Sequence, residues 1–429
     1  MSRFGALITL RTGYPGSPLQ EAYVHPPRLV RYVAPLIIGA LALSACGSKK
    51  ESGGSTTAKS YTIGVVAPLT GDLAAIGQGI KNGVDLAIKQ ANEKKTVKGV
   101  TLKLDAEDDT AKAEVGAQVA AKFVADNSII GVVGPLNSSV AKSVAPVLSP
   151  ADLVEISPSN SNVDLTGRGA LATGGTQVRL YKSYFRVVAT DDIQGPFAAQ
   201  FAVKTLMKKT IAIVHDKKAY GQGLAEAFAK EAAKDGATVL KTETINPGDK
   251  DFSATITKLK VQKPDFLFYG GEYPEASLLT KQMKAAGLNI PLMGGDGVQA
   301  DGFITTGGKA AEGDFATALG APTDSLDSAK QFVTDYAAQK YADPIGPYGA
   351  YAYDAANIII AALAKSTADG GKTGQELRAE ITKEVGDTDA EGVTGKLSFD
   401  QFGDTNSKVL TVYTVKGGKF VASKTDTFK

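Results

Sequence analysis

Residues 210–233 read TIAIVHDKKAYGQGLAEAFAKEAA, and this stretch decides the fold class. Its first part, 210–216, is a short apolar run rich in β-branched residues, which is typical of a buried strand. From Leu224 to Ala233 the apolar residues recur at helical spacing. A strand followed closely by an amphipathic helix is half of a βαβ unit. It therefore predicts a parallel sheet with helices on both faces.

The same alternation continues on both sides of this stretch. Strands are predicted at 61–69, 101–109, 129–135, 153–159, 184–190, 210–216, 238–245, 265–271 and 290–297, with two late strands at 395–400 and 408–415. Helices are predicted near 77–94, 111–126 and 137–149, and most of 327–383 is helical in pattern. Two such series predict an α/β protein with two doubly wound, parallel-sheet lobes.

Composition narrows the functional classes. The chain has 429 residues, of which 43% are hydrophobic and 21% charged, enough for two domains and a leader. The formal net charge of +2 gives no reason to expect nucleic-acid binding. The only cysteine is Cys46 and the only histidines are His25 and His215. An intrachain disulfide is excluded, and we expect no metal and no cofactor.

The first 45 residues have the pattern of a secretory signal peptide. Arg28 and Arg31 precede an apolar run at 33–43, and small residues then lead to Cys46. The run is too short to span a bilayer comfortably as a permanent helix. The sequence LSAC at 43–46 resembles the bacterial lipobox, in which the cysteine is lipidated. We therefore expect a lipid anchor at Cys46, outside the cytoplasm.

Two segments flank this leader pattern. Residues 46–60 are small and polar, which predicts a flexible tether between the anchor and a soluble body. Residues 1–27 contain four prolines and do not resemble the start of a signal peptide. We expect that translation begins downstream of Met1.

Polar segments follow several predicted strands, where open α/β sheets bind their ligands. They are PLNSS (135–139), SPSNSN (157–162), HDKKAYG (215–221), GGEYPE (270–275) and GGDG (294–297). Serine hydroxyls and helix N-termini can hold a carboxylate, and an acidic side chain can hold an ammonium group. The segments suit a small zwitterion, although each could also be an ordinary turn or helix cap.

Longer motifs carry a family resemblance. They are IAIVHDKKAYGQGLAEAF (211–228), GDKDFSATITKLK (248–260), DFLFYGGEYPEA (265–276) and PLMGGDGV (291–298). Through them the chain resembles the leucine/isoleucine/valine-binding proteins, the receptors of branched-chain amino-acid ABC importers, over about residues 63–399. The resemblance implies an extracytoplasmic binding protein that closes on an amino acid and delivers it to a membrane permease with its ATPase. We expect it to act as a monomer.

The resemblance also implies a type I periplasmic-binding fold with three crossovers, near residues 190, 319 and 400. Lobe 1 would then combine 61–190 with 320–400. Lobe 2 would combine 191–319 with 401–429.

Five positions match ligand contacts of the family. The resemblance implies that the Ser138 hydroxyl holds the ligand carboxylate and that the Ser159 backbone carbonyl accepts from the ammonium group. It implies that Ser161 contacts both groups and that Tyr220 closes onto the ligand from lobe 2. It further implies that Asp296 neutralises the ammonium group.

Two positions depart from the family's side-chain pocket. Ile76 and Glu272 stand where the family has aromatic residues. Glu272 either recognises a polar or basic ligand side chain, or it faces water or pairs with Lys217 or Lys218. Three tyrosines of a predicted helix are expected in the core or the cleft wall: Tyr348, Tyr351 and Tyr353.

Two other functional classes stay open. His215 beside Asp216 could suggest a hydrolase, but the chain has no G-x-S-x-G elbow. A sensor or receptor-type protein that binds small amides or urea is the other alternative, although such a ligand would not need the ammonium partner Asp296.

Overall fold

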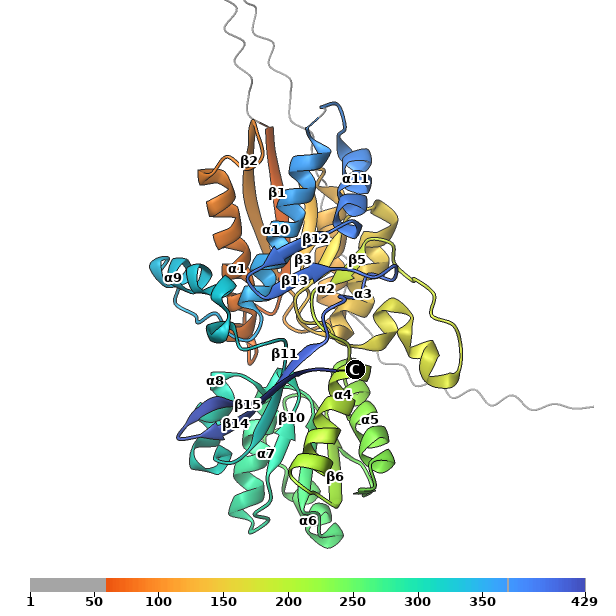
Figure 1. Ribbon diagram of the computed structural model, residues 1–429, viewed down its shortest axis with the longest axis vertical. Coiled ribbons are helices and arrows are strands. Elements are labelled where there is room, and N and C mark those ends of the chain that lie inside the picture. The colour runs from red at the N-terminus through yellow and green to blue at the C-terminus, as the bar shows by residue number, and fades with distance from the viewer. Residues whose placement is uncertain (1–58, 369, 429) are drawn as a thin grey trace, which may run out of the picture. The chain divides into compact units, whose positions relative to one another are not determined.

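The computed structural model describes residues 59–368 and 370–428 (Figure 1). The predicted signal peptide, the lipidation site Cys46 and most of the tether lie outside these residues. The first sheet is parallel and has the strand order β2-β1-β3-β4-β5. Its strands are β1 (Lys59–Ala67), β2 (Val100–Asp108), β3 (Ile129–Val133), β4 (Glu155–Ser157) and β5 (Tyr184–Arg186). This is a doubly wound order: the chain adds β2 on one side of β1 and β3, β4 and β5 on the other, so the switch point lies between β1 and β3.

Helices from both halves of the chain pack around the first sheet. They are α1 (Ala74–Glu93), α2 (Ala113–Ala125), α3 (Ser138–Leu148), α9 (Lys330–Ala338), α10 (Gly349–Ser366) and α11 (Gly374–Gly386). The backbones of α1 and α10 come very close, since a Cβ atom on Gly83 would lie 2.2 Å from the Gly349 carbonyl oxygen. This contact fixes the start of α10 beside the middle of α1.

The second sheet has the order β15-β14-β11-β10-β9-β6-β7, with β8 also paired to β6. Its strands are β6 (Thr210–His215), β7 (Thr238–Val239), β8 (Glu243–Thr244), β9 (Phe266–Gly270), β10 (Leu292–Gly294), β11 (Phe315–Leu319), β14 (Val409–Lys416) and β15 (Lys419–Thr427). Its helices are α4 (Asp191–Gln200), α5 (Ala219–Lys234), α6 (Ser253–Gln262), α7 (Tyr273–Ala285) and α8 (Asp301–Gly307). A separate small hairpin pairs β12 (Asp389–Gly392) with β13 (Gly395–Ser398).

The α/β fold class with two doubly wound sheets is confirmed, but the second sheet is not parallel throughout. Strands β14 and β15 run antiparallel to their neighbours. They form a hairpin whose turn contains Gly417 and Gly418, both with positive φ, as the tight turns of twisted hairpins require. Figure 1 shows the chain returning from the first-sheet region to place these strands beside β11.

One predicted strand was wrong in detail, and three strands, β11, β12 and β15, were not predicted. Residues 238–245 form two separate two-residue strands, since they lie at the sheet edge and pair only with β6. Strand β11 was not predicted, because its sequence FATAL includes alanines, which are depleted in strands. Pairing with β10 on one side and β14 on the other makes it a strand.

No helix in the described residues is long and apolar enough to cross a membrane.

Candidate functional site

A small cavity opens where strand ends of the two sheets meet. It is lined by Ile76, Leu136, Asn137, Ser138, Ser159, Tyr220, Glu272, Asp296, Gly297 and Tyr348. The loops after β3 and β4 contribute from the first sheet, and those after β6, β9 and β10 contribute from the second. The cavity therefore lies at the carboxyl ends of the strands, where parallel sheets bind ligands. It gathers all the predicted ligand and pocket residues except Ser161.

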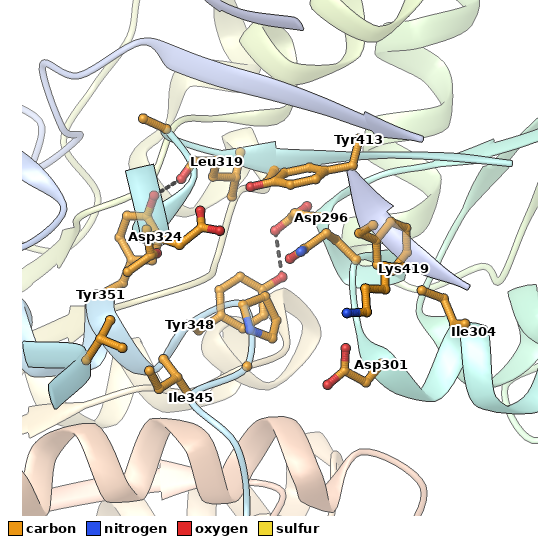
Figure 2. A pocket seen from close by; sticks show the side chains of 18 of the residues that line it. Asp296, Asp301, Ile304, Leu319, Asp324, Ile345, Tyr348, Tyr351, Tyr413 and Lys419 are labelled. Atoms are coloured by element: carbon orange, nitrogen blue, oxygen red, sulfur yellow. Dashed lines mark hydrogen bonds between the residues drawn. The ribbon is translucent and has the colours of Figure 1, made fainter. Parts of the chain in front are cut away.

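Asp296 is the most highly connected group of the cavity. Its Oδ1 accepts hydrogen bonds from Tyr220 Oη at 2.7 Å and from Gln194 Nε2 at 2.9 Å. Its Oδ2 accepts from Tyr348 Oη at 2.6 Å (Figure 2). Burial raises the pKa of Asp296, and the hydrogen bonds from Tyr348, Gln194 and Tyr220 oppose this rise. An incoming cation would favour the ionised form.

Two predicted serines lie across the cavity from Asp296. Ser138 is the first residue of α3 and is 2% exposed, so its hydroxyl lies at a helix N-terminus, where anions are favoured. The Ser159 hydroxyl donates to the carbonyl oxygen of Leu136 at 3.0 Å. That bond joins the loops after β3 and β4.

Ser161 does not line the cavity, although it is fully buried. Its carbonyl oxygen accepts from the backbone N–H of Asp191 at 2.8 Å. Within the described residues, neither the Ser161 hydroxyl nor either carboxylate oxygen of Asp191 has a hydrogen-bond partner at normal distance. Burial raises the pKa of Asp191 well above its ordinary value. Asp191 was not among the residues predicted from sequence to form the site.

Glu272 pairs with a lysine, as one of the two sequence hypotheses expected. Its Oε2 accepts from Lys218 Nζ at 2.8 Å, and its Oε1 accepts from Asn137 Nδ2 across the cavity. Burial lowers the pKa of Lys218, but the carboxylates of Glu272, Asp216 and Glu275 together outweigh burial and the pKa is raised. Lys217 instead binds Asn246. Glu272 still lines the cavity, so pairing and ligand recognition are compatible.

Further contacts hold the loops of the two sheets together. The backbone N–H of Ala219 donates to Ser139 Oγ at 3.0 Å, and Asn162 Nδ2 donates to the Ala219 carbonyl at 2.7 Å. Tyr273 Oη donates to the Asp72 carbonyl at 2.5 Å. These bonds join residues of α5 and α7 to the loops of the first sheet. The structure thus has the cavity in a closed arrangement.

His215, which the hydrolase alternative would use, makes a local hydrogen bond in the structure. Its Nδ1 accepts from the backbone N–H of Lys217 at 3.1 Å, within the turn after β6. Burial lowers the pKa of His215 and so favours the neutral ring. In the described residues, no three His, Cys, Asp or Glu side chains converge as metal ligands would.

A larger pocket adjoins the cavity and shares Asp296 and Tyr348 with it (Figure 2). Tyr351, at its wall, donates from its hydroxyl to the Leu319 carbonyl rather than to the cavity. Of the three tyrosines that the sequence placed in the core or cleft wall, only Tyr348 lines the smaller cavity. The contact of Gly83 with Gly349, the first residue of α10, explains why Tyr348 is held there.

The fold and the cavity together define a two-sheet α/β protein with a cavity lined by strand-end loops of both sheets. A family model described as periplasmic binding protein matches residues 60–419. The chain belongs to this family of solute-binding proteins.

Individual relatives agree with this assignment. The chain is 34% identical to the Leu/Ile/Val-binding protein BraC3 of Rhizobium johnstonii, over 85% of this chain and 94% of that protein. The leucine-binding protein LivK of Thermotoga maritima is similar in structure, with a TM-score of 0.74, 27% identity and coverage of 86% and 99% of the two chains. A second similar structure is LivJ of Streptococcus pneumoniae, a branched-chain amino acid transporter substrate-binding protein solved with isoleucine. It gives a TM-score of 0.74 at 26% identity, covering 86% of this chain and 100% of LivJ.

Proposed function

We propose that this protein is the substrate-binding component of an ABC importer and that it captures an α-amino acid of the branched-chain type. The observation that carries the proposal is that Ser138, at a helix N-terminus, and the buried carboxylate of Asp296 line one cavity from opposite sheets. Such a pair suits the carboxylate and ammonium groups of a zwitterion. The names of the relatives support the branched-chain class.

In this proposal the head group is held from both sides. The Ser138 hydroxyl and the N–H groups at the start of α3 bind the carboxylate, while Asp296 and the Ser159 carbonyl bind the ammonium group. Ser161 would join them only after a shift of its loop. Tyr220 contributes through Asp296, to which its hydroxyl donates at 2.7 Å. Every ligand charge then has a partner, as burial requires.

We infer that the cavity opens and closes by hinge motion at the three crossings near residues 190, 319 and 400. Lobe 1 (61–190 and 320–400) would bind the ligand first, and lobe 2 (191–319 and 401–429) would close over it. The closed monomer would deliver the amino acid unchanged to a permease and its ATPase. A lipid on Cys46 would anchor it outside the cytoplasm, with the signal peptide removed.

The test is a thermal-shift screen of the purified protein against the standard amino acids, small amides and urea, followed by calorimetry on each hit. A ligand that binds only the folded form raises the melting temperature by mass action. We expect stabilisation by α-amino acids of branched-chain size. Stabilisation by amides or urea alone would overturn the proposal in favour of the amide-binding alternative.

A further inference from the structure

The side-chain end of the cavity is polar because two helix starts face each other there. Asn137 and Glu272 immediately precede α3 and α7, and neither side chain caps its own helix. Instead the two side chains bond to each other across the cavity. Both line the cavity, and they are only 5% and 7% exposed. Their remaining polar atoms are therefore available to a ligand and hardly to bulk water.

The Asn137 side chain has a free acceptor. The amide nitrogen must face the Glu272 carboxylate, because the carboxylate can only accept. This orientation fixes Oδ1 as the other atom, and within the described residues Oδ1 has no hydrogen-bond partner. A buried carbonyl-type oxygen without a donor is costly, so a ligand that supplies one gains affinity.

The surroundings of Glu272 are short of donors as well. Asp109 and Asp216 are buried, and each has one carboxylate oxygen without a hydrogen-bond partner in the part of the chain that the structure describes. Burial raises the pKa of each to about 7, with a further contribution from the Glu272 charge. Lys218 bonds to Glu272 from the side of these aspartates. Neither aspartate lines the cavity, so the unpaired acceptor that a ligand in the cavity can reach is Asn137 Oδ1.

We infer that this site selects, among amino acids of branched-chain size, those whose side chain carries a hydrogen-bond donor, a hydroxyl or a carboxamide. The donor binds Asn137 Oδ1 and the Glu272 carboxylate, while Ile76 and Leu136 contact the carbon atoms of the side chain. Since Lys218 already balances Glu272, the ligand side chain needs no net charge. The inference rests on the proposed function, whose head-group contacts it leaves unchanged.

The experiment uses two nearly isosteric pairs, threonine against valine and asparagine against leucine, in calorimetric titrations of the full-length protein. Each pair keeps shape and head group and differs in the donor. We expect threonine to bind roughly tenfold more tightly than valine, and asparagine more tightly than leucine, because the apolar member leaves Oδ1 unpaired. In Asn137→Ala the threonine-to-valine ratio should fall towards one.

A matched control is Glu243→Gln, which alters another buried carboxylate of the second sheet, paired with Lys258 at 2.8 Å and not part of the cavity lining. It should leave the ratio unchanged. If valine and leucine bind the unmodified protein as tightly as their polar counterparts, the inference is wrong and the proposed function stands. If no α-amino acid binds, the proposed function itself fails. The comparison in the unmodified protein needs no variant to fold.

Discussion

Replacing Asp296 by asparagine separates ligand binding from folding. The carboxylate accepts from Tyr220, Gln194 and Tyr348, and burial raises its pKa. In the variant, the amide oxygen can still accept from Tyr220 and Gln194, and the Tyr348 hydroxyl can turn to accept from the amide nitrogen. The folded state keeps its hydrogen bonds and loses a buried charge. We therefore expect the free energy of unfolding at neutral pH to stay equal or rise.

Ligand binding should respond in the opposite direction. The ammonium group of the bound amino acid loses its anionic partner in a cavity closed to water. A hydrogen bond between charged groups contributes about 1.5–3 kcal/mol, and a buried charge left without its partner costs about 3–5 kcal/mol. A loss of about 3 kcal/mol corresponds to roughly 150-fold weaker binding. Calorimetric titration with the best amino acid of the ligand screen measures it.

The pH dependence gives a second readout of the same change. Asp296 must be ionised to pair with ammonium, so the affinity of the unmodified protein falls as the pH drops through the raised pKa of this carboxyl group. The asparagine variant should bind weakly without this fall. Asp314→Asn is the control, since Asp314 is equally buried but pairs with Lys284 at 2.7 Å and does not line the cavity. Equal affinity in Asp296→Asn and the unmodified protein would refute the assignment of the ammonium site.

Three further changes test the fold. Glu155 is buried without a hydrogen-bond partner among the described residues, and burial raises its pKa well above 4.5. Above pH 4.5 the folded state therefore keeps a proton that the unfolded state releases, so the free energy of unfolding falls as the pH rises. Glu155→Gln should flatten this dependence of unfolding free energy on pH, measured by urea unfolding at several pH values. In the unmodified protein the Arg186 guanidinium is 0% exposed and pairs with Asp404 at 2.7 Å. Asp404→Ala leaves this buried charge without its counter-ion, and we expect the free energy of unfolding to fall by about 3–5 kcal/mol. A fall below about 1 kcal/mol would contradict this. Gly83→Ala places a methyl group 2.2 Å from the Gly349 carbonyl oxygen and should lower the unfolding free energy by about 1–3 kcal/mol, seen as a lower melting temperature.

Periodicity predicted the elements whose sequences favour them locally. Strands such as β6 and β9 are continuous apolar runs that are buried on both faces of a parallel sheet, so their pattern identifies them without any partner. Strand β11 has no such pattern, and only its neighbours β10 and β14 make it a strand. The antiparallel direction of β14 likewise follows from the path of the returning chain.

The sequence by itself determined which loops follow which strands, and in doubly wound sheets those loops end at one edge. This rule places at a common edge the segments that contain Ser138, Ser159, Tyr220 and Asp296, and the family resemblance singled out these residues within them. Ser161 also follows a predicted strand, yet it does not line the cavity, because the position of a residue within a loop depends on packing.

Only the tertiary structure decided which groups face each other across the cavity. Asn137 meets Glu272, Lys218 pairs with Glu272 while Lys217 does not, and Tyr348 reaches Asp296 from the position just before α10. The residues of each pair are far apart along the chain, and Asn137 and Glu272 follow strands of different sheets, so no local pattern encodes these contacts. The contacts arise because burying apolar surface brings the two sheet edges together, and each polar group enclosed there must then find a partner.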